Sequence, residues 1–174
     1  MNIEHHNYVE PLRVNGKVIL NSFPGLDDNK IFQQHILFNQ LSAFVNFNCS
    51  TVVSLVEDSE FDQLCEKKLF VRNIYQHNLN WIHMPIVDLK VPNHEFKQKW
   101  LTTKILLKNN LIQGKNIVLH CKGGIGRSGT IAALILIEHG EENINAIKLV
   151  RKKRQGAIEN KLQEQFVLDY RVIN

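Results

Sequence analysis

The chain has 174 residues, of which 44% are hydrophobic and 22% are charged. This length suits one compact domain, and this composition excludes an intrinsically disordered chain. Lys and Arg outnumber Asp and Glu by 21 to 17, and the resulting formal net charge of +4 fits an anionic ligand without singling one out.

The first third of the chain predicts a hairpin followed by a helix. Asn15-Gly16 precedes the apolar run Val18-Ile19-Leu20, which is typical of a β-hairpin over about residues 12–21. Asp27 and Asp28 are candidate N-caps of a helix whose apolar residues share one face: Leu37, Leu41, Phe44 and Val45.

From residue 51 onward, strand patterns alternate with helix patterns. We expect buried strands at 51–56, 81–84 and 117–119, and helices at 60–70, 95–112, 130–137, near 143–154 and 160–171. This alternation predicts an α/β fold with a central, mostly parallel sheet flanked by helices on both faces. We expect one domain over residues 1–174, with its core at about 22–171.

The cysteines and the termini bear on the compartment. Cys49, Cys65 and Cys121 show no spacing typical of a disulfide framework, so we expect reduced thiols. Residues 1–11 are polar and lack the apolar core of a signal peptide, and the longest apolar run, Ile131–Ile137, is too short to span a bilayer. We therefore expect a cytoplasmic protein, while export without a signal peptide stays open.

The most informative segment is residues 120–128, His-Cys-Lys-Gly-Gly-Ile-Gly-Arg-Ser, between a buried strand and a buried helix. Its glycines allow the backbone to curl so that successive N–H groups point inward. Together with the positive end of the following helix, these groups predict a cradle for a tetrahedral anion. The expected phosphate-binding residues are Lys122, Gly123, Gly124, Ile125, Gly126 and Arg127.

Three side chains of this segment carry the expected chemistry. Cys121 lies at the mouth of the cradle, where the amides, the helix dipole and Arg127 favour a thiolate nucleophile. The planar guanidinium of Arg127 can bind two phosphoryl oxygens at once. Ser128 can donate a hydrogen bond to the sulfur and help it leave in a second step. A lone cysteine is usually a small buried hydrophobe and a lone Gly-rich loop is weak, but the combination is specific.

This segment resembles the signature loop of the protein tyrosine phosphatase superfamily, His-Cys-x5-Arg-[Ser/Thr]. Residues 121–130 are similar in detail to the dual-specificity branch, in particular to the group of cyclin-dependent kinase-associated phosphatases and its bacterial relatives. The resemblance implies the dual-specificity phosphatase fold and a phosphocysteine intermediate on Cys121. It also implies that His120 orients the loop through buried hydrogen bonds. We expect no metal, because the sequence has no paired Cys-x-x-Cys site and its eight histidines are scattered, and no cofactor.

Two further segments extend the resemblance. Residues 83–88, His-Met-Pro-Ile-Val-Asp, with Pro92 after them, resemble a stretch of the same group that implies Asp88 as general acid and then general base. Residues 154–158 resemble the Arg-x-Gly-Ala-Ile segment, and by position Gln163 then matches the glutamine that helps to place the hydrolytic water. An exposed helical glutamine is an equal alternative for Gln163, and Glu159-Asn160 departs mildly from the group's usual residues.

Two charged runs allow weaker hypotheses. Glu57-Asp58-Ser59-Glu60 follows the first core strand, and we consider that it favours phosphopeptides with basic neighbours. The basic side chains at 148 and 151–154 are typical of a solvated helix face, and steering of an anionic substrate is a minority alternative.

The expected function is therefore that of a protein phosphatase acting on phosphotyrosine, with phosphoserine and phosphothreonine as further substrates. The expected partner is a phosphoprotein, with a kinase as one candidate; we expect no nucleic-acid partner and a monomer. One alternative is the same chemistry on a phosphoinositide or an RNA 5′-phosphate, although Ile125 stands where phosphoinositide phosphatases tend to carry a second loop lysine. A non-catalytic phosphoprotein-binding module is the alternative from another class, but such domains usually lose Cys, Arg or Asp.

Overall fold

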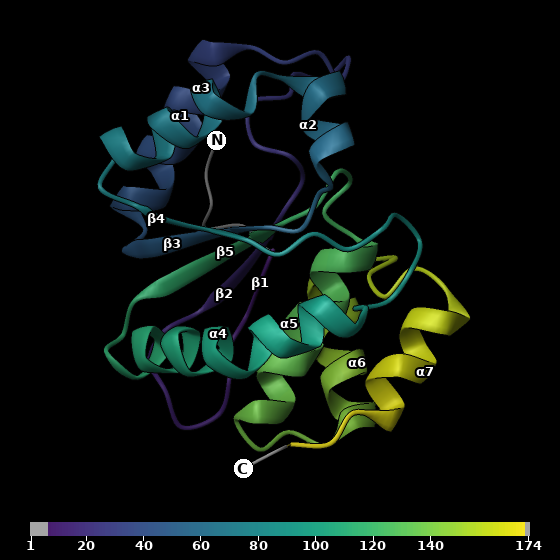
Figure 1. Cartoon of the computed structure of the whole chain (residues 1–174). Helices are drawn as coiled ribbons and strands as arrows, with labels where there is room; N and C mark the ends of the chain where they lie inside the picture. The colour runs from purple at the N-terminus through teal and green to yellow at the C-terminus, as the bar shows by residue number, and fades with distance from the viewer. Residues whose placement is uncertain (1–6, 173–174) are drawn as a thin grey trace.

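Five strands form one sheet in the computed structural model, which describes residues 7–172 (Figure 1). The strands are β1 (Tyr8–Val9), β2 (Val18–Asn21), β3 (Cys49–Ser54), β4 (Asn80–His83) and β5 (Asn116–His120). Their order is β1-β2-β5-β3-β4, with β1 antiparallel to β2 and all other neighbours parallel. The expected α/β class with a mostly parallel sheet is confirmed.

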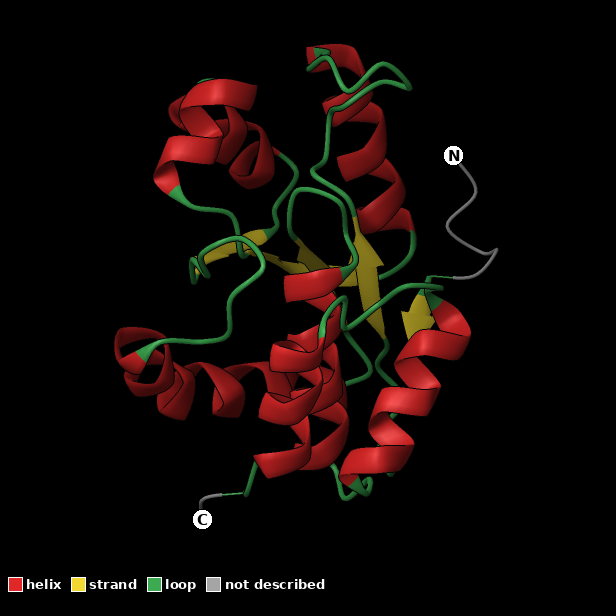
Figure 2. Ribbon diagram, turned by 90° about the vertical axis from the view of Figure 1, so that its right-hand side faces the viewer, coloured by secondary structure: helices red, strands yellow, loops and turns green. Residues whose placement is uncertain are grey.

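Helices cover both faces of this sheet, as both views of the molecule show (Figures 1 and 2). One face carries α1 (Gln34–Asn46), α2 (Asp58–Leu64) and α3 (Lys67–Gln76). The other carries α4 (His94–Ile112), α5 (Gly126–Glu138), α6 (Asn143–Lys153) and α7 (Lys161–Asp169). Among residues 7–172, no helix is long and apolar enough to cross a bilayer.

The alternation of side chains along the strands builds two cores. In β5, Ile117 and Leu119 join the core beneath α4 to α7, while Val118 joins the core beneath α1 to α3. All three side chains are fully buried. A strand with apolar residues on both faces is the pattern expected of a parallel sheet covered by helices.

The parallel strands bring their carboxyl ends to one edge of the sheet. His120, the last residue of β5, pairs with Asn21 of β2 on one side and Ser54 of β3 on the other. Ligands of open α/β sheets bind beyond this edge. The segments that follow β2, β3, β4 and β5 therefore meet around Cys121.

The N-terminal hairpin differs from the expectation of a tight turn at Asn15-Gly16. Its first strand is Tyr8–Val9, paired Tyr8 to Ile19, so residues 10–17 connect the two strands. Gly16 instead packs against the loop before β5: its N–H donates to Leu111 O at 3.1 Å, and a Cβ there would lie 2.4 Å from Lys115 O. Gly16 is therefore required where the backbone passes close to Lys115, and not by a hairpin turn.

Two helix predictions also need correction. Asp27 does not cap a helix, because its Oδ1 accepts hydrogen bonds from Asn29 N and Ile31 N, both at 2.9 Å, and closes a turn. The helix begins at Gln34, and Val45 is exposed rather than part of its buried face. The single helix expected at 60–70 is two, α2 and α3, separated at residues 65–66.

Candidate active site

The loop between β5 and α5 presents its amides to an anion because its carbonyls are bound from outside. Every carbonyl from 122 to 125 accepts a hydrogen bond: Lys122 O from Phe23 N (3.1 Å), Gly123 O and Gly124 O from the Arg154 guanidinium (3.2 Å each), and Ile125 O from Gly129 N (3.1 Å) and Ile158 N (3.3 Å). Because these carbonyls accept hydrogen bonds from residues outside the cradle, the N–H groups of the loop are available to bind a tetrahedral anion.

Gly124 is required by the path of this loop. Its φ of +70° lies in the left-handed region, and a Cβ there would approach the backbone of Asn21 and Ser22 to 2.5 Å. A larger residue would therefore have to push the loop off the end of β2.

Cys121 lies at the base of the loop with hydrogen-bonding groups around its sulfur. Gly124 N donates to Sγ at 3.2 Å, and Ser128 Oγ lies 3.5 Å from Sγ. Cys121 is 3% exposed and Ser128 is fully buried. The structure thus places Ser128 where the sequence predicted it, beside the sulfur. Burial raises the pKa of the Cys49 and Cys65 thiols to about 12, so neither is a competing nucleophile.

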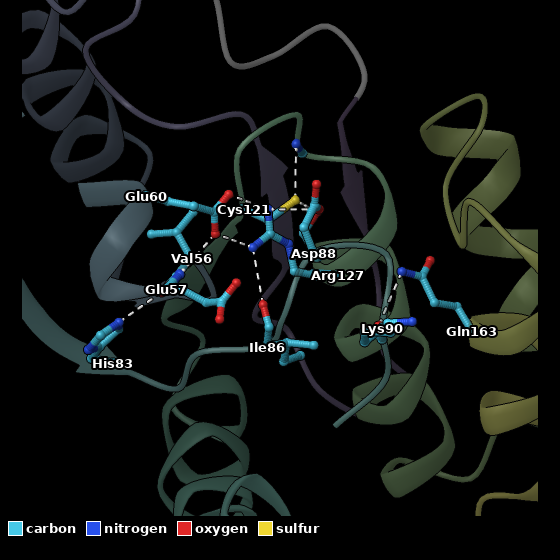
Figure 3. Close-up of polar contacts among 12 residues, drawn as sticks. Val56, Glu57, Glu60, His83, Ile86, Asp88, Lys90, Cys121, Arg127 and Gln163 are labelled. Atoms are coloured by element: carbon cyan, nitrogen blue, oxygen red, sulfur yellow. Dashed lines mark hydrogen bonds and ion pairs between the residues drawn. The ribbon is translucent and has the colours of Figure 1, made fainter. Parts of the chain in front are cut away.

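Arg127 is held in place by contacts within the protein. Its guanidinium is almost fully buried and makes a two-pronged ion pair with Glu60, Nη1 to Oε2 at 2.5 Å and Nη2 to Oε1 at 2.8 Å. Nη1 also donates to Ile86 O at 3.1 Å (Figure 3). A planar fork bound on one side in this way has a fixed orientation beside the loop.

Glu60 and Arg127 keep each other charged. Burial alone would raise the pKa of Glu60, but hydrogen bonds from Arg127 and from Glu57 N outweigh it and hold the pKa below its usual value. Burial alone would lower the pKa of Arg127, and the Glu60 carboxylate reverses that effect. This role of Glu60 was not predicted from the sequence, in which the acidic run 57–60 is seen only to follow the first core strand.

Asp88 approaches the same guanidinium from the loop after β4. Its Oδ1 lies 3.1 Å from Arg127 Nη2, while 58% of its side chain remains exposed. The structure therefore brings the predicted acid to the predicted cradle. An exposed carboxyl beside the cradle can exchange a proton with a bound ester or with water.

A cleft of about 240 Å³ opens over these groups. It is lined by the loop, the predicted acid and one unpredicted carboxylate: Asp88, Cys121, Lys122, Gly123, Ile125, Gly126, Arg127 and Glu159. A larger groove of about 470 Å³ lies between α4 and α7, but its lining of apolar and charged side chains contains no thiol nucleophile. Within residues 7–172, no group of three or more His, Cys, Asp or Glu side chains could hold a metal ion.

Gln163 lies beneath the cleft rather than in its lining. The side chain is fully buried; its Oε1 accepts from Glu159 N at 2.9 Å and its Nε2 donates to Lys90 O at 3.4 Å. It is therefore not the exposed helical glutamine of the alternative. The role of Gln163 in placing the hydrolytic water stays a prediction. Glu159, unlike Gln163, lines the cleft.

The two charged runs are largely committed to internal contacts. In the acidic run, Glu57 caps α2 and Asp58 pairs with Lys67 at 2.5 Å, which gives no support to a role in selecting basic peptides. In the basic run, Arg154 binds the phosphate loop, and Arg151 donates to Ala157 O (3.1 Å) and Ile158 O (3.0 Å). These arginines shape the site by holding main chain, a role that charge patterning alone did not reveal.

His120 is buried and neutral behind the loop. Its Nε2 lies 2.6 Å from Ser54 Oγ, which also accepts a hydrogen bond from Trp81 Nε1 at 2.7 Å. Burial lowers the pKa of His120 to about 3. A histidine that stays neutral and hydrogen-bonded within the sheet suits the predicted orienting role better than that of a base.

The buried His120 should make folding stability depend on pH. Below pH ~6.5 the imidazole of His120 is protonated in the unfolded chain, whereas in the folded chain it stays neutral down to about pH 3. The contribution of His120 to folding stability is therefore full above pH ~6.5 and is lost as the pH decreases. The expected slope from this residue approaches about 1.4 kcal/mol per pH unit. Urea unfolding at pH 7, 6 and 5 should show a shallower dependence for His120→Gln than for the wild type. Equal slopes would contradict the neutral buried state.

Comparison with known proteins identifies the family. Residues 30–141 match the family model described as "Polymorphic toxin system, DSP-PTPase phosphatase". The chain belongs to the DSP-PTPase phosphatase family. The predicted relationship to cysteine-dependent tyrosine and dual-specificity phosphatases is confirmed, and the chain is accordingly a phosphatase of this class.

Individual DSP-PTPase relatives agree with this assignment. The chain is 30% identical over 120 residues to protein tyrosine phosphatase type IVA 3 of Bos taurus, covering 64% of this chain and 68% of that protein. It spans 57% of the length of the protein of the same name from Mus musculus. Kinase associated phosphatase (KAP) superposes with a TM-score of 0.77 over 94% of this chain and 91% of that chain, at 19% identity. PTPMT1, solved in complex with PI(5)P, superposes with a TM-score of 0.65 over 87% of each chain, at 21% identity.

Proposed function

We propose that this chain removes phosphate from phosphoproteins through a phosphocysteine on Cys121, acting on phosphotyrosine and also on phosphoserine and phosphothreonine. The observation that carries the proposal is the convergence of a sulfur, a buried guanidinium and an exposed carboxyl on one small cleft. We propose as its partner a phosphoprotein, with a kinase as one candidate because the similar KAP is a kinase associated phosphatase.

The first step transfers the phosphoryl group to the enzyme. Cys121 Sγ attacks phosphorus, the bond from phosphorus to the leaving oxygen breaks, and the Asp88 carboxyl gives its proton to that oxygen. Arg127 and the loop amides bind the equatorial oxygens, whose charge they stabilise in the transition state.

The second step returns the enzyme to its starting state. Water attacks the phosphocysteine from the side that the leaving group vacated, and the Asp88 carboxylate takes a proton from that water. The bond from phosphorus to sulfur breaks, Ser128 stabilises the departing Cys121 thiolate, and inorganic phosphate leaves. Glu159 also lines the cleft, where it is a further polar group beside the attacking water.

A phosphoinositide is the second candidate substrate, because the similar PTPMT1 was solved with PI(5)P bound. Phosphate release from a phosphotyrosine peptide, a phosphothreonine peptide, PI(5)P in mixed vesicles and a 5′-phosphorylated RNA separates the candidates. We expect the phosphotyrosine peptide to give the highest kcat/KM. A higher kcat/KM on PI(5)P would overturn the protein substrate while leaving the cysteine chemistry in place.

A further inference from the structure

The loop after β4 that carries Asp88, called the acid loop below, is hydrogen-bonded to the start of α7. Asn160 Nδ2 donates to Leu89 O at 3.0 Å, directly after the predicted acid. One residue further, Lys90 O accepts from Gln163 Nε2 at 3.4 Å (Figure 3). Two side chains separated from this loop by about 70 positions thus hold two successive carbonyls.

Both donors are themselves fixed to α7. Asn160 is the N-cap of the helix, and its Oδ1 accepts from Gln163 N at 2.9 Å. Gln163 is fully buried, and its Oε1 accepts from Glu159 N at 2.9 Å. Each amide therefore has its oxygen bound within the helix start and its nitrogen directed at the acid loop, which makes the contact rigid.

The acid loop needs such an anchor. Leu89 adopts φ +58°, a left-handed conformation that costs a non-glycine residue about 1 kcal/mol or more. The side chains of Asp88 and Leu89 are more than half exposed, so packing does little to hold this turn. Besides the hydrogen bond of the turn itself, from Lys90 N to Val87 O at 3.0 Å, the two side-chain donors of α7 oppose its relaxation.

We propose that Asn160 and Gln163 are positioning residues that latch the acid loop closed over the cleft, keeping Asp88 beside Arg127. This inference rests on the proposed function, because it assigns the latch a role through the proton transfers of Asp88. In the latched arrangement Asp88 Oδ1 lies 3.1 Å from Arg127 Nη2. Loss of the latch should slow the cleavage of esters whose leaving oxygen must be protonated more than the cleavage of esters whose leaving oxygen departs as an anion.

Asn160→Ser tests the latch. Serine keeps an oxygen that caps α7 but removes the amide donor to Leu89 O. With phenyl phosphate, whose leaving oxygen needs a proton, we expect kcat/KM to fall about tenfold. With 2,4-dinitrophenyl phosphate, whose leaving group departs unprotonated, we expect a loss below about threefold. Asn93→Ser is the matched control, because Asn93 caps α4 in the same way through Phe96 N.

A double-mutant cycle asks whether the effect passes through Asp88. In the Asp88→Asn background, adding Asn160→Ser should change kcat/KM on phenyl phosphate less than about twofold, because the proton donor is already absent. Equal losses on both esters, or a tenfold loss that persists without Asp88, would overturn the latch and leave Asn160 a purely structural cap.

Amide hydrogen exchange makes the test independent of activity. Exchange of the amides between residues 87 and 92 should be several-fold faster in Asn160→Ser than in the wild type and in Asn93→Ser. Unchanged exchange would overturn the latch whatever the kinetics show. Absence of Cys121-dependent turnover in the wild type would instead overturn the proposed function. The exchange result would then still report whether Asn160 holds the acid loop.

Discussion

Cys121→Ser should abolish phosphate release, lowering kcat by about 10⁴-fold or more on any phosphate ester. The serine hydroxyl occupies the same buried position, but it is a far weaker nucleophile and a far worse leaving group than a thiolate. The fold should persist, because the replacement is nearly isosteric and Gly124 N and Ser128 Oγ can still hydrogen-bond to an oxygen there. Steady-state phosphate release and thermal unfolding measure the two effects.

The covalent intermediate gives this experiment a second readout. Rapid acid quench of the wild type with an aryl phosphate should trap one phosphoryl group on the peptide that contains Cys121. Cys65→Ser is the matched control and should leave turnover within about twofold, because the half-buried Cys65 thiol, whose pKa is raised to about 12, takes no part in the reaction. Residual activity of Cys121→Ser within tenfold of the wild type would rule out the thiolate mechanism.

Much of this site could be predicted because its key residues are close in sequence. Cys121 and Arg127 lie in one loop, and the curl of that loop follows from its glycines and from the strand and helix on either side. Asp88 was predicted from the resemblance of residues 83–88 to a stretch of the same phosphatase group. The sheet explains why it reaches the loop, because the parallel strands β4 and β5 end at one edge. Their convergence is therefore a consequence of topology.

The partners of these residues could not be predicted, because they depend on three-dimensional distances between distant segments. Glu60 binds Arg127 across 67 positions, and Asn160 reaches Leu89 across 71. In sequence, Glu60 is one acid among several, and Asn160 is only a good helix cap. The hairpin was misplaced for a related reason: Asn15-Gly16 is a turn signal, yet Gly16 is small because Lys115 passes close to it.

The ion pair between Glu60 and Arg127 should carry the largest stability effect in the site. Glu60→Gln keeps the shape of the side chain but removes the two-pronged anionic partner of the almost fully buried guanidinium, so that only the exposed Asp88 carboxyl remains beside it. Breaking a buried pair from one side typically costs about 3–5 kcal/mol, because the remaining charge stays desolvated. We expect a loss of about 3 kcal/mol in the free energy of unfolding, measured by urea denaturation at pH 7.

The same substitution should weaken phosphate recognition. Without the two-pronged support, the Arg127 fork can rotate away from the loop, and we expect kcat/KM on an aryl phosphate to fall about tenfold to a hundredfold. Glu57→Gln is the matched control: it is three positions away, caps α2 and does not bind the guanidinium. It should cost at most about 1 kcal/mol and leave kcat/KM within about twofold.

The pH dependence of this stability difference tests its electrostatic origin. Because Arg127 holds the pKa of Glu60 below its usual value, the contribution of the pair is full above the unfolded pKa of about 4.3 and is lost as the pH falls through the lower, folded-state pKa. The gap between the wild type and Glu60→Gln should therefore be constant from pH 7 to about pH 5 and narrow below about pH 4. A gap that persists unchanged in acid would mean that Glu60 acts by packing rather than by charge.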